Sequence, residues 1–339
     1  MTAMSTRQES GSVSRRPGQC VCALRPPLIA ALVHTLSVPA LVWPRDLGGT
    51  VLDHLTLANG DRLDFFIEGE GDALLIYHHG TPAAGPPSAD MVEAATSNGF
   101  VLAELVRPGY GQSTRQPGRT VADIAPLVAS LADHLGHDRF VTMGWSGGGP
   151  HAIATAALLP ERCLAAKSLA GVAPYGEPDL DFMAGMGEDN ICEFGAALQG
   201  AAQLEAFLTE AHAQMRDVTA DQVVEAMISL LPPVDQGYLS GKEAEEMAAE
   251  LRWSLAHGIW GWFDDDVAFT LPWGFDLAAV TRPVQIWQGS EDLMVPFAHG
   301  QWLAGNVGGA QPYLVNGHGH LSLAATCFGP GFAALREAL

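Results

Sequence analysis

Short apolar runs separated by polar turns recur along most of the chain. Residues 51–57 and 62–68 are predicted strands, because the Asn-Gly pair between them is a strong hairpin signal. The run at 73–77 is continuously apolar, which is typical of strands that are covered on both faces of a parallel sheet. It is one of six further predicted strands. They are 73–77, 101–106, 139–143, 167–170, 283–287 and 312–315.

Helical patterns lie between these strands. Residues 121–135 have a helical period behind a Thr120/Asp123 capping box, and an Ala-rich helix is predicted at 151–159. The alternation predicts an α/β fold with a mostly parallel twisted sheet and helices on both faces. The strands stop between residues 175 and 270, where three helices are predicted, at 197–214, 220–230 and 243–257. We therefore expect a core of residues 46–174 and 271–339 with a helical cap, 175–270, inserted into it.

Residues 1–45 are predicted to be a separate N-terminal extension. Arg15 and Arg16 precede a mostly apolar stretch, 28–43, that is interrupted by His34 and Pro39. An export signal within residues 1–40, a disordered or loosely packed extension, and a surface helix all fit this pattern. We expect a cytoplasmic protein, with export as the alternative. No apolar run reaches the ~20 residues of a membrane-spanning helix, so stable membrane insertion is not expected.

Composition narrows the classes of partner. With 48% hydrophobic residues the chain can bury a sizeable core, while a formal net charge of −21 opposes binding to nucleic acid or to an anionic membrane. The five cysteines lack zinc-site spacing and are expected to be small buried thiols. The close histidine pairs at 78–79 and 318–320 lack a third ligand at a recognisable spacing, so neither a metal nor a cofactor is expected. The expected partner is a small-molecule substrate, and the oligomeric state stays open.

The motif Gly-Trp-Ser-Gly-Gly at 144–148 fits the G-x-S-x-G pattern of a nucleophile elbow. A predicted strand precedes it and a predicted helix follows it. The serine of such a motif stands at a sharp, strained corner, so the positions two before and two after must lack side chains. Gly144 and Gly148 occupy those positions, and Ser146 is the candidate nucleophile.

The loop at 79–82, His-Gly-Thr-Pro, follows a strand that comes before the nucleophile strand. An acyl-transfer enzyme needs two backbone N–H groups directed at the developing oxyanion. One belongs to the residue after the nucleophile, here Gly147, and Thr81 is the predicted second donor. These two residues would form the oxyanion hole.

The acid and base of a serine triad are expected on loops that follow later strands, with the acid first. Asp292 follows the 283–287 strand and is the predicted acid; the alternatives are Glu291, Asp179 and Asp181. His318 and His320 both follow the last strand, and spacing alone does not choose between them.

These motifs together resemble the α/β-hydrolase superfamily from about residue 51 to the C-terminus. The Gly-His-x-x-Leu ending of that family matches residues 319–323, which selects His320 as the base. The segment 107–113 looks like the family's Gly-rich turn, which is structural. The resemblance implies acyl transfer in which Asp292 holds His320, His320 deprotonates Ser146, and an acyl-enzyme forms.

Departures from the family's branches narrow the chemistry. Haloalkane dehalogenases and epoxide hydrolases of this fold have Asp where this chain has Ser146. Proline iminopeptidases are similar in size and cap but carry Trp directly after the nucleophile, whereas here Trp145 precedes it. All three activities are therefore disfavoured.

Residues 253–275 contain seven tryptophans and phenylalanines around an aspartate triplet at 264–266. The aromatic residues are predicted to pack the cap on the core, with an apolar substrate pocket as the alternative. The triplet is predicted to be a solvated turn, with a site for a substrate amine as the alternative.

The leading hypothesis is a cofactor-free serine esterase acting on a small or medium apolar carboxylic ester. The same triad could instead cleave an amide or peptide, as an aminopeptidase does, a lactone, or a carbon–carbon bond. A non-catalytic ligand-binding protein on a hydrolase scaffold is the alternative from another class.

Overall fold

The computed structural model describes residues 51–339, and the expectations for residues 1–45, an export signal included, lie outside the described residues. Within the described residues the chain forms one eight-stranded sheet of order β1-β2-β4-β3-β5-β6-β7-β8. β1 pairs with β2, and β2 with β4, in antiparallel fashion, and all other neighbours are parallel. The strands are β1 Val51–Thr56, β2 Arg62–Glu68, β3 Ala73–His78, β4 Phe100–Leu105, β5 Phe140–Trp145, β6 Cys163–Leu169, β7 Val284–Gly289 and β8 Ala310–Val315.

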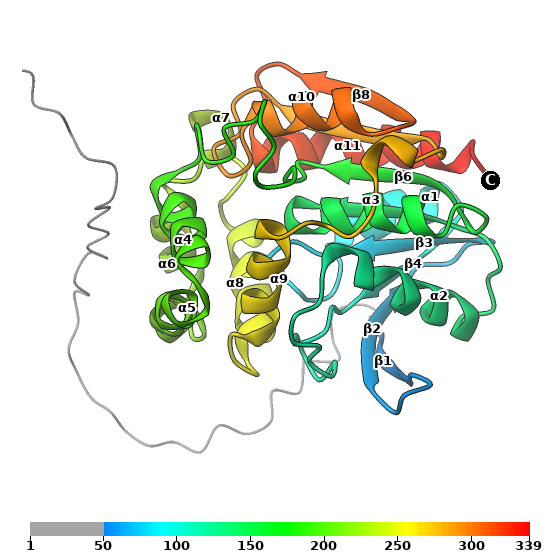
Figure 1. The fold of residues 1–339 in the computed structure, drawn as a ribbon, viewed down its shortest axis with the longest axis horizontal. Helices are drawn as coiled ribbons and strands as arrows, with labels where there is room; N and C mark the ends of the chain where they lie inside the picture. The colour runs from blue at the N-terminus through cyan, green and yellow to red at the C-terminus, as the bar shows by residue number, and fades with distance from the viewer. Residues whose placement is uncertain (1–50) are drawn as a thin grey trace, which may run out of the picture. The chain divides into compact units, whose positions relative to one another are not determined.

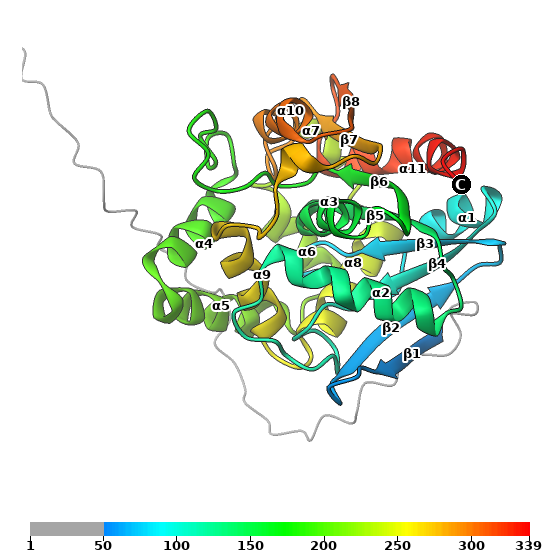
Figure 2. The ribbon, with the colours of Figure 1, turned by 45° about the vertical axis from the view of Figure 1, so that its right-hand side comes forward.

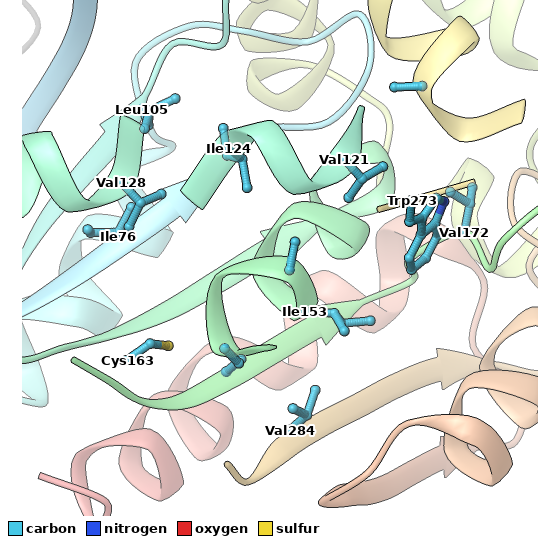
Figure 3. Close-up of a cluster of buried hydrophobic side chains, with 14 of the residues drawn as sticks. Ile76, Leu105, Val121, Ile124, Val128, Ile153, Cys163, Val172, Trp273 and Val284 are labelled. Atoms are coloured by element: carbon cyan, nitrogen blue, oxygen red, sulfur yellow. The ribbon is translucent and has the colours of Figure 1, made fainter. Parts of the chain in front are cut away.

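Helices cover both faces of this sheet, as the alternation of strands and helices predicts. On β3, Leu74 and Ile76 belong to one hydrophobic cluster, which also includes residues of α2 (Ile124–His134), α3 (Gly149–Leu158) and α10 (Phe297–Asn306). Figure 3 shows part of this cluster between α3 and the strands. The alternate β3 positions, Leu75 and Tyr77, pack with α1 (Ala89–Ser97) and α11 (His320–Arg336) on the other face. The predicted α/β-hydrolase fold class is confirmed.

A helical insertion, residues 170–283, separates β6 from β7. Its helices are α4 Glu188–Gln199, α5 Ala201–Met215, α6 Ala220–Met227, α7 Pro233–Gln236, α8 Lys242–Leu255 and α9 Trp260–Thr270. They gather beyond one end of the sheet, toward which the arrowheads of β3 and β6 point (Figures 1 and 2). This is the edge at which the candidate catalytic loops leave the strands. The predicted boundaries of core and cap stay a prediction.

Two expectations for the insertion were wrong in detail. The helix predicted at 197–214 is two helices, because Gly200 adopts a φ of 117° that only glycine readily takes. The aspartates at 264–266 lie in α9 and are buried, rather than in a solvated turn. Two of the three carboxylates are paired with arginines, which makes their burial possible. No helix among residues 51–339 combines the length and apolar character needed to cross a membrane.

Candidate active site

Ser146 stands at the corner between β5 and α3. Its φ is +54°, in the left-handed region that residues other than glycine rarely adopt, so the turn is strained as the motif predicts. A Cβ atom at Gly144 would overlap the carbonyl group of Gly148, and one at Gly148 would overlap the carbonyl oxygen of His78. Ser146 and Trp145 are partly exposed, whereas Gly147 and Gly148 are buried. A substrate can therefore reach this hydroxyl.

The two predicted oxyanion donors lie side by side. A Cβ atom built on Gly147 would overlap Oγ1 of Thr81, so the side chain of Thr81 lies directly against Gly147. The loop after β3 also passes Ser146 itself, because a Cβ atom on Gly80 would lie 3.7 Å from Cβ of Ser146. The structure thus brings Thr81, Gly147 and Ser146 together.

The predicted acid and base form a buried pair. Nδ1 of His320 lies 2.8 Å from Oδ2 of Asp292 in a hydrogen bond, and both side chains are almost fully buried. Oδ1 of Asp292 accepts the backbone N–H groups of Met294 and Val295, each at 2.9 Å, which fixes the carboxylate. Nε2 of Gln288 donates to Oδ2 at 3.0 Å. These bonds hold Asp292 in one orientation toward the imidazole.

The imidazole of His320 is also placed next to the nucleophile turn. Its ring stacks on that of Trp145, the residue before Ser146, with 5.8 Å between ring centroids. Burial by itself lowers the pKa of His320, but the charge and hydrogen bond of Asp292 and the charge of Asp235 raise it above its ordinary value. A raised pKa favours the imidazolium that forms when a base accepts the proton of a serine.

The alternative residues take other places. Glu291, Asp179 and Asp181 are exposed, and the carboxylate of Glu291 accepts a hydrogen bond from Ser290 at 3.0 Å. The backbone carbonyl oxygen of His318 accepts a hydrogen bond from the backbone N–H of Glu291 at 2.8 Å. Of the candidate acids, Asp292 is the one hydrogen-bonded to the imidazole of His320.

The sequence predicts Arg107 only as part of a structural turn, yet Arg107 holds from behind the loop 79–82, which carries the predicted oxyanion donor Thr81 (the oxyanion loop). Its Nη1 donates to the carbonyl of His79 at 2.6 Å, and Nη2 donates to the carbonyl of Gly80 at 2.8 Å. The guanidinium is fully buried. It therefore fixes two successive carbonyls just before Thr81.

Asp265 of α9 joins this arrangement from the helical insertion. Its Oδ2 accepts hydrogen bonds from Oγ1 of Thr81 at 2.7 Å and from Nη2 of Arg107 at 2.6 Å. The hydroxyl of Tyr110 also donates to Oδ2, at 2.9 Å, and Arg119 donates to Oδ1 at 2.5 Å. Burial alone would raise the pKa of Asp265, but the charges of Arg107 and Arg119 hold it well below its usual range. A permanent carboxylate is thus attached to the oxyanion loop.

The sequence held one signal for this role that was not used. Trp262 and Phe269 stand three residues before and four residues after Asp265, at helical spacing, so an amphipathic helix could have placed the aspartate on a buried face. Its partners, Arg107 and Thr81, lie more than 150 residues away. Local patterns do not reveal such a pairing.

This sheet topology, with a strained serine after one central strand and a histidine–aspartate pair after later strands, defines the α/β-hydrolase class of proteins. The chain belongs to the alpha/beta hydrolase fold family, whose model matches residues 73–324.

Individual relatives are distant. An uncharacterized hydrolase, YcgS of Bacillus subtilis, is 28% identical over 104 residues, which span 31% of this chain and only 36% of that protein. An alpha/beta hydrolase fold protein from Nakamurella multipartita is 23% identical with a TM-score of 0.59, over 85% of this chain and 99% of that one. The epoxide hydrolase VrEH1 of Vigna radiata is 17% identical with a TM-score of 0.60, over 85% and 98% of the two chains. At these identities the solved structures show the fold alone.

Proposed function

We propose that the protein is a serine hydrolase that cleaves a carboxylic ester of a small or medium apolar substrate through an acyl-enzyme. The observation that carries this proposal is the arrangement around Ser146. A partly exposed serine in a strained turn is followed by Gly147, which touches Thr81, and is preceded by Trp145, whose ring stacks on that of His320. Each member has a role in acyl transfer, whereas a binding protein has no need of the strained serine.

The chemistry follows from these positions. Oγ of Ser146 attacks the acyl carbon while its proton passes to Nε2 of His320, whose Nδ1–H is held by Asp292. The N–H groups of Thr81 and Gly147 stabilise the oxyanion of the tetrahedral intermediate. His320 then gives the proton to the leaving alkoxide oxygen, and the acyl group stays on Ser146. Water, deprotonated by His320, releases the carboxylic acid in the reverse sequence.

An ester is favoured over the N-terminal residue of a peptide by the aspartates of α9. An aminopeptidase would need a free anionic group for the substrate amine, and residues 264–266 were the candidates. Asp264 is paired with Arg115 at 2.8 Å, and Asp265 with Arg107 and Arg119. Burial, with the adjacent Glu193, raises the pKa of Asp266 well above its usual range, which favours a neutral acid. The triplet therefore offers little charge to an incoming ammonium group.

Hydrolysis of a panel of p-nitrophenyl esters of increasing acyl length, with matched p-nitroanilides, tests the proposal. Wild type should turn over the esters repeatedly, and S146A should lose about 10⁴-fold or more in kcat, as serine triads do. S130A, which removes an exposed hydroxyl of α2, is the matched control and should keep full activity. Turnover of the anilides alone would support the amide alternative. Ligand binding without turnover would support the non-catalytic alternative.

A further inference from the structure

The short helix α7 of the helical insertion places an aspartate at the start of α11. The carboxylate of Asp235 is fully buried. Its Oδ2 accepts a hydrogen bond from the backbone N–H of Leu321 at 2.9 Å, and its Oδ1 accepts one from the N–H of Ser322, also at 2.9 Å. Asp235 thus caps a helix of the sheet domain from a position 86 residues earlier in the chain.

This cap comes from a distant part of the chain and replaces the cap that α11 lacks in the residues just before it. The first N–H groups of a helix have no partner inside it, and a Ser, Thr, Asp or Asn just before the helix ordinarily accepts from them. Here that position is Gly319, which has no side chain. A Cβ atom at Gly319 would overlap the carboxylate of Asp235, so the glycine and the remote aspartate are matched to each other. The N–H of Gly319 is bonded to Oγ of Ser322 at 2.8 Å.

The capped helix begins with the candidate base. His320 is the first residue of α11, and the two amides that Asp235 holds belong to the next two residues. Fixing those amides fixes the backbone from which the imidazole projects. The charged group bonded to that ring is Asp292, from the loop after β7, and on the nucleophile side the ring meets the uncharged indole of Trp145. His318 lies two residues before His320, in the loop after β8. Asp235 adds a negative charge from the helical insertion.

We propose that Asp235 is a positioning residue for His320: it fastens the turn that carries the imidazole and places a second carboxylate near it. This inference rests on the proposed function, because it assigns Asp235 to the base of that reaction. If Asp235 has this role, the helical insertion helps to position the base, because α7 must contact the core for Asp235 to cap α11.

The charge of Asp235 gives the proposal a signature in pH dependence. The negative charges of Asp292 and Asp235 both raise the pKa of His320, while burial lowers it. His320 must be neutral to accept the proton of Ser146, so activity falls on the acid side as the imidazole becomes protonated. Removing the charge of Asp235 lowers the pKa of His320. The fall in activity at acid pH, which is the acid limb of the pH profile, then occurs at lower pH. Loss of the cap lowers the plateau rate independently.

The experiment measures the rate of fluorophosphonate labelling against pH for wild type, D235N and D235E, together with an NMR titration of the His320 ring. D235N should move the acid limb and the ring titration to lower pH and should lower the plateau by about tenfold or more, within the ~10²-fold that a small misplacement can cost. D235E keeps the charge, so its limb should stay in place while its plateau falls. The control D276N removes an exposed capping carboxylate that accepts from the N–H of Ala278 at 2.9 Å, and it should change neither.

The outcomes separate the two proposals. If wild type is labelled and D235N keeps both the limb and the plateau, the role of Asp235 is overturned while the serine hydrolase stands. If wild type is never labelled but the ring titration moves in D235N, the effect of Asp235 on His320 stands and the proposed reaction fails. If D235N does not fold, D235E decides the matter, since an unchanged plateau there would overturn the positioning role.

Discussion

Replacing Asp265 by Asn removes one negative charge from a buried cluster that contains two guanidinium groups. The carboxylate accepts from Arg107, Arg119, Tyr110 and Thr81. The amide of Asn keeps one acceptor oxygen, but its NH₂ group is a donor that faces donors. Arg107 would lose its counter-ion while it stays buried, and Thr81 would lose the acceptor for its hydroxyl. We expect both stability and catalysis to suffer.

The magnitude follows from the burial of both partners. Removing one member of a fully buried ion pair typically costs about 3–5 kcal/mol, because the other charge is left without compensation. In chains somewhat shorter than this one, each kcal/mol of lost stability lowers the Tm by about 2–4 °C. Even a loss of about 3 kcal/mol should therefore lower the Tm by roughly 6 °C or more. A misplaced, rather than deleted, oxyanion donor should lower kcat by about 10- to 100-fold, somewhat less than the ~10²–10³ of a deletion. KM should change less than kcat, because the oxyanion exists only after attack.

The neighbouring residue on the same helix provides a matched control. Asp264 is paired through hydrogen bonds of 2.8 Å with Arg115, whose side chain is 29% exposed. D264N should therefore cost only about 1 kcal/mol and leave kcat unchanged. Calorimetric Tm values and the kinetics of an active ester at 25 °C would be measured for both variants. A D265N enzyme with a lowered Tm but the kcat of wild type, or a D264N enzyme with an equal loss of kcat, would refute the positioning role of Asp265.

Three further predictions use other features of the site. G147A should lower kcat by at least about 10²-fold, because its Cβ would overlap Thr81. The control G195A has open space around the added Cβ and should be active. A fully active G147A would contradict the oxyanion assignment. G319A should lower both Tm and activity, because its Cβ would overlap Asp235. The control G329A, in the same helix, should keep or raise the Tm, because alanine has the higher helix propensity. Equal Tm values for the two variants would count against capping of α11 by Asp235. Burial lowers the pKa of His78 from 6.5 to about 3, so between these pH values the unfolded state binds the extra proton and stability falls as the pH falls, by up to about 1.36 kcal/mol per pH unit. Urea titrations at pH 7, 6 and 5 should show this loss, and H78Q should reduce its slope; identical slopes would exclude His78 as the cause.

The sequence was most informative where the determinants are local. Buried parallel strands are visible as apolar runs, and the elbow at Ser146 needs glycines at fixed spacing, so fold class and nucleophile turn could be predicted. The strand β6 begins at Cys163 rather than at the predicted Lys167. In the structure this lysine is buried and donates from Nζ to the carbonyl of Cys327 at 2.8 Å. A polar residue in a strand was thus accommodated by a partner 160 residues away.

The supporting residues of the site could not be predicted for the same physical reason. Asp235 follows two prolines and has no helical or strand period around it, and its partners lie at the far end of the chain. The sequence predicts that Asp265 is solvated, because three adjacent aspartates ordinarily avoid burial. Only the folded chain shows that arginines from the core neutralise two of them. Residues that react have recognisable motifs, whereas residues that position them are recognised by contact.

The central claim is that Ser146 is an activated nucleophile. Intact mass after exposure to a fluorophosphonate, for wild type and S146A in parallel, tests it most directly. Wild type should gain one covalent adduct and S146A none, with both proteins folded by circular dichroism. A folded wild type that stays unlabelled, or an S146A variant that is labelled equally, would contradict it.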